Sequence, residues 1–258
     1  MWMPDGLSTK ARIGLLTPHL DPVPETELQV MAPTGVTIHV ARVPLGMVDT
    51  NGNIVPEIGP DVAKAFSEPP AIDNAVKLLE PLNLAAIIYA FTSSSYIMGI
   101  EGDEQLKARL SVLGRGIPII IQTIALVAAL RALEIKKIAL IHPPWYTSEL
   151  DNLGADYFTQ AGFEVVFHAS ANLSEDYGDI PPDIIFDWIK SNIPIDVDSI
   201  VIGGSGFRAI GIINELESVL GKPVITANQA SLWHALAVSD VDFEIPSYGM
   251  LFGAKNKS

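Results

Sequence analysis

Ala85-Ala86-Ile87-Ile88-Tyr89-Ala90-Phe91-Thr92-Ser93-Ser94-Ser95 carries the clearest structural signal in the chain. Seven apolar residues without polar alternation predict a strand that is buried on both faces, as in a parallel sheet. Hydroxyl residues end this run at Thr92. Small hydroxyl residues at the carboxyl end of a buried strand, ahead of a helix, present O–H and N–H donors to an anion. The same residue types also favour the N-cap of any helix, so both interpretations stand for this run alone.

A second stretch repeats this design. Ile200-Val201-Ile202-Gly203-Gly204-Ser205-Gly206 is again an apolar run that ends in small residues. Further along the chain, the segment from Val219 to Ile225 matches the segment from Val112 to Ile119. These repeats predict a diverged duplication in which Phe91 and Gly204 take equivalent positions. We expect the two half-domains to bring both loops together across one cleft, where a small ligand usually binds.

Composition excludes several classes of function. The formal net charge of -14, from 16 basic and 30 acidic residues, argues against nucleic acid or an anionic membrane as a partner. Cysteine is absent, which excludes disulfides, thiolate metal ligands and thiol nucleophiles. The chain has no His-x-x-x-His spacing, and the segment from Gly203 to Gly206 lacks the lysine of a phosphate loop. We therefore expect neither a metal site nor a nucleotide cofactor.

The same composition bears on where the protein resides. Residues 1–6 lack the basic start and apolar core of a secretory leader. The longest apolar stretch, from Ile117 to Leu130, contains polar residues and is too short to span a bilayer. These features predict a cytoplasmic protein.

Polar residues follow two other predicted strands. The strand from Ile13 to Leu16 leads into a loop that three prolines stiffen and that holds His19 and Asp21. These two side chains could form an acid/base pair, or they could simply be solvated. His142 and Tyr146 follow a strand that begins at Lys136. Each has a structural interpretation when considered alone, but both would share a sheet edge with the two serine-bearing loops.

Two helices are predicted beside these strands. Helical spacing extends from Asp103 to Leu113. Small residues fill a second helix from Ala125 to Leu133, which should pack closely against its neighbours. That contact could lie within one chain or between the subunits of a homo-oligomer.

With these segments in place, the chain resembles the arylmalonate decarboxylase and maleate isomerase branch of the aspartate/glutamate/hydantoin racemase superfamily. The matching segments are Arg12–Leu15, Met31–Arg42, Thr92–Ser93, Tyr146 with Glu149–Leu150, Gly203–Gly206 and Tyr248–Phe252. This resemblance implies an α/β fold of two Rossmann-like lobes with parallel sheets, related by a pseudo-twofold axis. It also implies a carboxylate site in the cleft between the lobes and no cofactor. We expect residues 1–115 and 229–258 to form one lobe and residues 116–228 to form the other.

The chain departs from the family at the residues that carry protons. The family uses cysteine at one or both strand-end positions, which here correspond to Phe91 and Gly204. Asp21 stands where the family has a loop asparagine that contacts substrate. Two-base racemisation needs a base on each face and covalent isomerisation needs a thiolate, so neither can run in its usual form.

What remains is an anion-binding pocket. The resemblance implies that Thr92, Ser93 and Tyr146 bind a small carboxylate substrate. The further predicted substrate-binding residues are Phe91, Gly204 and Gly206, and the predicted catalytic residues are His19, Asp21 and Ser205.

The function predicted from this pocket is that of a cofactor-independent decarboxylase-type lyase, since decarboxylation depends chiefly on stabilising the enediolate that is left behind. Two alternatives stay open. One is a maleate isomerase or racemase with altered acid/base groups. The other is a catalytically inactive carboxylate-binding protein.

Overall fold

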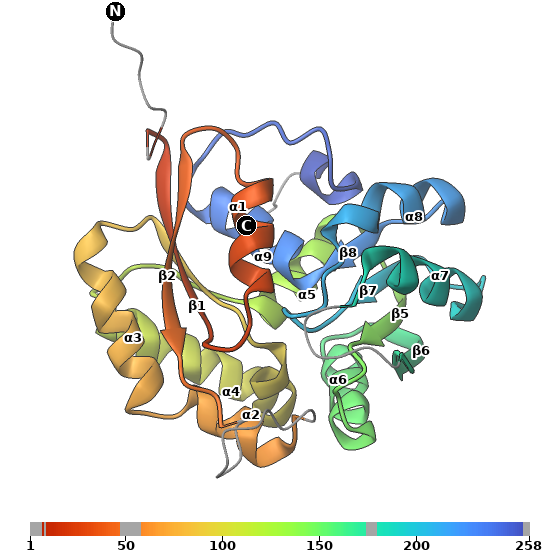
Figure 1. Cartoon of the computed structure of the whole chain (residues 1–258), viewed down its shortest axis with the longest axis horizontal. Helices are drawn as coiled ribbons and strands as arrows, with labels where there is room; N and C mark the ends of the chain where they lie inside the picture. The colour runs from red at the N-terminus through yellow and green to blue at the C-terminus, as the bar shows by residue number, and fades with distance from the viewer. Residues whose placement is uncertain (1–6, 8, 47–57, 174–179, 255–258) are drawn as a thin grey trace, which may run out of the picture.

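The computed structural model describes residues 7, 9–46, 58–173 and 180–254, and it consists of two parallel α/β lobes (Figure 1). Each lobe is built on a four-stranded sheet, with strand order β2-β1-β3-β4 in the first and β6-β5-β7-β8 in the second. The strands are β1 (Ala11–Pro18), β2 (Val36–Val43), β3 (Ala86–Tyr89), β4 (Ile119–Ile121), β5 (Lys137–His142), β6 (Glu164–Ser170), β7 (Ser199–Ile202) and β8 (Val224–Thr226). The α/β fold of two parallel sheets that the sequence predicts is confirmed.

Helices connect and cover these strands. The α-helices are α1 (Val23–Met31), α2 (Pro60–Ser67), α3 (Ala71–Leu79), α4 (Thr92–Leu113), α5 (Gln122–Ala132), α6 (Ser148–Gln160), α7 (Pro182–Asn192), α8 (Ile213–Leu220) and α9 (Ala227–Val238). Short 3-10 helices lie at η1 (Glu80–Leu82), η2 (Ile210–Ile212) and η3 (Met250–Gly253). No helix in the described ranges is long and apolar enough to cross a membrane. Residues 1–6, on which the expectation about a leader depends, lie outside the described residues.

The two sheets share one topology, as expected of two copies of a duplicated unit. In the first sheet β1 pairs with β2 and β3, and Leu16 lies opposite Tyr89. In the second sheet β5 pairs with β6 and β7, and Ile141 lies opposite Ile202. Because Leu16 corresponds to Ile141 in this alignment, the residues that follow these strands also correspond in the two lobes.

Helices α5 and α9 are exchanged between the lobes. α5 follows β4 of the first sheet and packs against β8 of the second, whereas α9 follows β8 and packs against β3 and β4. Both helices also pack against each other, and Figure 1 shows them between the two sheets. β4 pairs with β3 and so belongs to the first sheet, which extends past the boundary predicted at residue 115. The rest of the predicted domain division stays a prediction.

Helices α1 and α4 differ from what the sequence predicts. The loop with three prolines gives way to α1 at Val23, because Pro24 lies in the first turn, where its missing N–H costs no hydrogen bond. α4 begins at Thr92 rather than at Asp103, and non-helical backbone at Gly99 interrupts it (φ 69°, ψ -178°). The hydroxyl run therefore forms the first turn of α4, directly beyond β3.

Packing against the strands stabilises α3, which covers the first sheet. Leu79 is only 3% exposed and its side chain lies against Gly14 of β1. The preceding residue, Leu78, is 73% exposed. The two leucines have the same helix propensity but opposite environments.

Leu79→Ala should lower the free energy of unfolding by about 2 to 5 kcal/mol, because it removes buried methyl groups and leaves a cavity. Leu78→Ala should change it by less than about 0.5 kcal/mol, since that side chain is already in water. Urea unfolding of both variants, followed by circular dichroism, measures the difference. Equal destabilisation by the two substitutions would contradict this placement of α3.

Candidate functional site

The loops that follow β3 and β7 touch each other between the lobes. The backbone N–H of Gly204 donates to Thr92 Oγ1 at 3.2 Å. Ser205 Oγ donates to the carbonyl oxygen of Ala90 at 3.3 Å. The two strand-end loops that the sequence predicts to meet are therefore in direct hydrogen-bond contact.

One half of the candidate site is a convergence of three hydroxyl groups. Ser93 Oγ donates to Tyr146 Oη at 2.8 Å, and Thr92 Oγ1 shares a hydrogen bond of 2.9 Å with the same oxygen. Thr92 and Ser93 lie in the first turn of α4, where backbone N–H groups and the helix dipole favour an anion. Phe91 is the N-cap and makes no side-chain cap, so these hydroxyls bond across the lobes instead of capping the helix. Burial raises the pKa of Tyr146 to about 12, which keeps its hydroxyl a proton donor.

The other half contains a buried carboxyl group. Ser205 Oγ donates to Asp21 Oδ2 at 3.3 Å, and the backbone N–H of Val23 donates to Asp21 Oδ1 at 3.0 Å. Burial raises the pKa of Asp21 to about 6, against the opposing effect of these hydrogen bonds and of Arg42. A carboxyl group with this pKa holds its proton part of the time near neutral pH.

A second carboxyl group supports this half from behind. Asn228 Nδ2 donates to the carbonyl oxygen of Ser205 at 2.9 Å and to Glu27 Oε2 at 2.7 Å. Glu27 Oε1 accepts from the backbone N–H groups of Ala209 and Ile210. Burial raises the pKa of Glu27 to about 7. Glu27 and Asn228 thus hold the β7 loop in place, and the sequence contains no motif that points to either.

The two halves are related by the duplication. Thr92 follows β3 as Ser205 follows β7, and Asp21 follows β1 as Tyr146 follows β5. Each lobe therefore supplies one strand-end hydroxyl that bonds a loop residue of the other lobe. The loop residue is the phenol Tyr146 in one half and the carboxyl group of Asp21 in the other. The two halves therefore have equivalent positions but different chemistry.

The predicted pairing of His19 with Asp21 is wrong. Among the described residues no hydrogen bond or ion pair joins the two side chains. His19 is exposed, and its Nδ1 accepts from the backbone N–H of Leu45 at 3.0 Å. The chain turns after β1 so that Asp21 is buried against the β7 loop while the imidazole stays at the surface.

Phe91 and Gly204, the positions that correspond to the family cysteines, are both buried. The Phe91 ring packs on Phe66 with 4.4 Å between centroids. Gly204 has φ 81°, and a Cβ there would lie 2.8 Å from the Pro143 ring. A side chain at position 204 would therefore be strained. A Cβ at Gly206 would lie 2.9 Å from Asp21 Oδ2, so the absent side chain leaves room for the carboxyl group.

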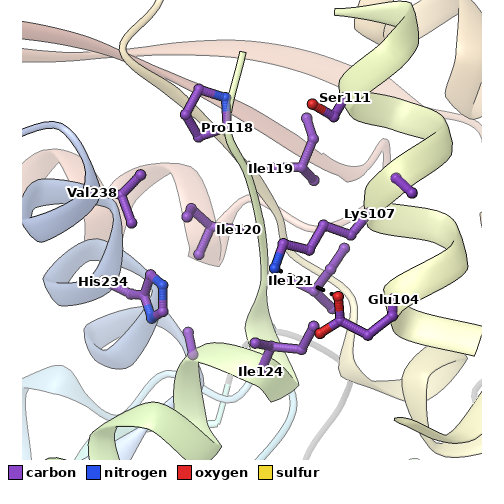
Figure 2. Close-up of a pocket in the computed structure, with 12 residues that line it drawn as sticks. Glu104, Lys107, Ser111, Pro118, Ile119, Ile120, Ile121, Ile124, His234 and Val238 are labelled. Carbon is purple, nitrogen blue, oxygen red and sulfur yellow. Dashed lines mark ion pairs between the residues drawn. The ribbon is translucent and has the colours of Figure 1, made fainter. Parts of the chain in front are cut away.

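A cavity of about 400 Å³ lies away from these residues, along β4 between α4 and α9. Figure 2 shows its isoleucine walls, with Lys107 and Glu104 reaching over from α4 and His234 from α9. None of the residues that line this cavity belongs to the cluster of Thr92, Ser93 and Tyr146. We therefore identify the candidate site by its hydrogen-bond donors and not by this cavity. Among the described residues no group of three or more His, Cys, Asp or Glu side chains could hold a metal ion.

Thr92→Ala combined with Ser93→Ala should weaken binding of a small carboxylate, such as phenylacetate, at least tenfold, or about 1.4 kcal/mol. The reason is that both substitutions remove hydroxyl donors that converge on Tyr146. Calorimetric titration measures the change. Thr159→Ala combined with Ser191→Ala, which removes two exposed helix hydroxyls, is the matched control and should leave affinity unchanged. Equal affinity in the two double variants would exclude a binding role for Thr92 and Ser93.

Comparisons with known proteins identify the family of the chain. The family model described as arylmalonate decarboxylase matches residues 70–252. The maleate isomerase of Geobacillus stearothermophilus is 24% identical over 259 residues, which cover 95% of this chain and 98% of the isomerase.

Solved structures of both enzymes share the fold. The maleate isomerase Iso of Pseudomonas putida S16, a cysteine-to-alanine variant with maleate, superposes with a TM-score of 0.82 at 24% identity, covering 95% of this chain and 98% of that one. A Nocardia farcinica maleate cis-trans isomerase with a covalently bound succinylcysteine intermediate gives 0.80 at 21% identity, with 94% and 98% covered. An arylmalonate decarboxylase gives 0.73 at 19% identity, with 95% and 100% covered. The resemblance noted in the sequence is confirmed, and the chain belongs to the arylmalonate decarboxylase family.

Proposed function

We propose that this chain is a decarboxylase-type lyase that acts on a small malonate-type acid, a dicarboxylic acid with both carboxyl groups on one carbon. The relatives are enzymes of two kinds, maleate isomerases and arylmalonate decarboxylases. The observation that supports the lyase is the pairing of the uncharged donor cluster at Thr92, Ser93 and Tyr146 with a buried carboxyl group at Asp21.

The donor cluster would hold the carboxylate that remains on the substrate. Its three hydroxyls bond one another at 2.8 and 2.9 Å, so they converge on one point and can turn their protons to an anion. When the C–C bond to the departing carboxylate breaks, its electron pair moves onto the retained carboxylate and forms an enediolate. Donors aimed at that developing charge stabilise such a transition state by about 3 to 4 kcal/mol per well-placed group.

Asp21 would supply the proton that completes the reaction. Its carboxyl group lies beside Ser205, and its charge raises the pKa of Tyr146, so the two halves interact electrostatically. The protonated Asp21 would transfer its proton to the α-carbon, directly or through the Ser205 hydroxyl, and the resulting carboxylate would regain a proton from water. This role requires a carboxyl group that still holds its proton part of the time near neutral pH, and the raised pKa of about 6 allows this.

Maleate isomerisation is the second candidate, because the maleate isomerase relatives align with almost the whole chain. The Nocardia farcinica isomerase carries a succinylcysteine intermediate, and this chain has no cysteine to form one. An isomerase here would need another nucleophile, and Ser205 is the hydroxyl beside a carboxyl group. Decarboxylation requires no covalent nucleophile, and we therefore place it first.

The purified protein should release CO2 from phenylmalonate and form phenylacetate, with one deuterium at the α-carbon when the reaction runs in deuterated water. Proton NMR follows both phenylmalonate and maleate in parallel samples. Conversion of maleate to fumarate without CO2 release would instead establish the isomerase. Binding of both acids without conversion of either would identify a catalytically inactive carboxylate-binding protein.

Asp21→Asn should lower the turnover number about 100-fold or more, with a smaller effect on KM, because the amide cannot deliver a proton to the α-carbon. In the parent protein, turnover should fall as pH rises through about 6, since the deprotonated Asp21 is the inactive form. Rates measured between pH 5 and 8 check both points. Asp61→Asn, which changes an exposed carboxyl group on α2, should keep the parent profile. A parent profile that is flat across pH 6 would contradict this role for Asp21.

A further inference from the structure

A buried cluster of two histidines and one aspartate lies directly behind Tyr146. His142 Nδ1 and His168 Nδ1 each lie 2.6 Å from a different oxygen of Asp151. His142 is fully buried at the end of β5, whereas the His168 side chain on β6 is 34% exposed. The His142–Asp151–His168 cluster therefore reaches from the solvent into the interior of the second lobe.

This cluster contacts the donor half of the candidate site in two ways. The His142 ring stacks on the Tyr146 ring, with 5.1 Å between centroids and 22° between planes. His142 Nε2 also lies 3.2 Å from the hydroxyl of Tyr96, which lies on α4 with Thr92 and Ser93. The Tyr146 ring thus separates the His142 imidazole from the hydroxyl groups that would face a bound carboxylate.

The donor half contains no cation of its own. Thr92, Ser93 and Tyr146 bond to each other and to the backbone of Gly204, and the charged group that acts on Tyr146 is Asp21, an acid. Burying a carboxylate beside uncharged donors alone carries a large desolvation cost. His142, which stacks on Tyr146, can become positively charged, and Asp151 connects it to His168.

We infer that binding of a carboxylate at Thr92, Ser93 and Tyr146 is coupled to the uptake of one proton by the His142–Asp151–His168 cluster, which then supplies the counter-charge. The inference rests on the carboxylate site of the proposed function and adds how its charge is balanced. In the cluster the Asp151 carboxylate lies against both imidazole rings. One added proton converts His142 to an imidazolium behind Tyr146, and this proton enters from water through the partly exposed His168.

The charged surroundings of the cluster favour this exchange. Burial lowers the pKa of His142, although Asp151 opposes that effect, so burial favours the neutral ring while no anion is bound. Burial would raise the pKa of Asp151, but the hydrogen bonds from both histidines outweigh it and hold that pKa below its usual range. The other titratable groups that face His142 are Tyr96 from α4 and Tyr146, and burial raises the pKa of both phenols. An anion placed near His142 in this low-dielectric region favours the protonated imidazole.

The coupling predicts a proton count that calorimetry measures directly. Titration with phenylacetate or succinate at pH 7.5, in buffers of different ionisation enthalpy, should show uptake of close to one proton per bound ligand. By linkage, affinity should fall about tenfold for each pH unit between 7 and 8.5, where both acids are fully ionised. Binding without proton uptake would overturn the coupling but leave the carboxylate site standing. Absence of binding would overturn the site itself, and the coupling with it.

Two variants distinguish the cluster from Asp21, the other group that could take up a proton. His142→Gln should abolish the uptake, whereas Asp21→Asn should retain it. His39→Gln is the matched histidine control, because that ring bonds Thr37 on the same strand of the first lobe, and it should retain the uptake. Uptake that persists in His142→Gln and disappears in Asp21→Asn would assign the proton to Asp21 and overturn the inference.

A measurement on the unmodified protein covers the case in which His142→Gln does not fold. The chain has five histidines, so their ring nitrogen signals can be followed by NMR. Saturation with phenylacetate at pH 7.5 should convert the His142 ring from the neutral to the imidazolium pattern. Spectra in which all five rings keep their protonation state on binding would overturn the inference.

Discussion

Several buried hydrogen bonds join the two lobes at the candidate site, and two of them, Thr92 with Tyr146 and Ser205 with Asp21, are related by the duplication. Each connects a hydroxyl at the end of one sheet to the loop that follows a strand of the other sheet. A buried polar group without a partner costs about 1 to 3 kcal/mol, so separating the lobes here would have to supply water or a ligand to every one of these groups. Without a ligand, the polar groups of the site therefore satisfy one another's hydrogen bonds. A bound carboxylate would accept hydrogen bonds from hydroxyl groups that already point into the site.

A large part of this architecture could be predicted from the sequence. The uninterrupted apolar run from Ala85 to Phe91 signals a doubly buried strand, and its repeat at Ile200 signals the duplication that brings Thr92 and Gly204 together. α9 gives no such signal, because a helix that is apolar on nearly every face lacks the periodicity that marks an amphipathic one. The sequence also gives no signal that α4 begins at Thr92, since Gly99 and the serines weaken the helical periodicity there.

The partners of individual side chains could not be predicted. Asp21 and His19 are close in sequence, but Asp21 bonds Ser205 from the other lobe, and Glu27 bonds Asn228. These pairings depend on how two sheets are placed in space, and no local pattern encodes that placement. The His142–Asp151–His168 cluster has the same origin, because its members come from β5, α6 and β6. The residue types at strand ends, Asp21 among them, are thus evident from the sequence, while the side chains that they bond are evident only from the fold.

The exchange of α5 and α9 has a consequence for how the chain is synthesised. Trp233 and Leu236 of α9 are fully buried, and α9 packs against β3 and β4, which are made much earlier. While residues 227–238 are still inside the ribosome, the first sheet has emerged with one apolar surface uncovered. The first lobe therefore cannot complete its core during translation before the second lobe has been made. The two lobes mature together, and a nascent chain that stops before Ala227 would present β3 and β4 to chaperones or to other nascent chains.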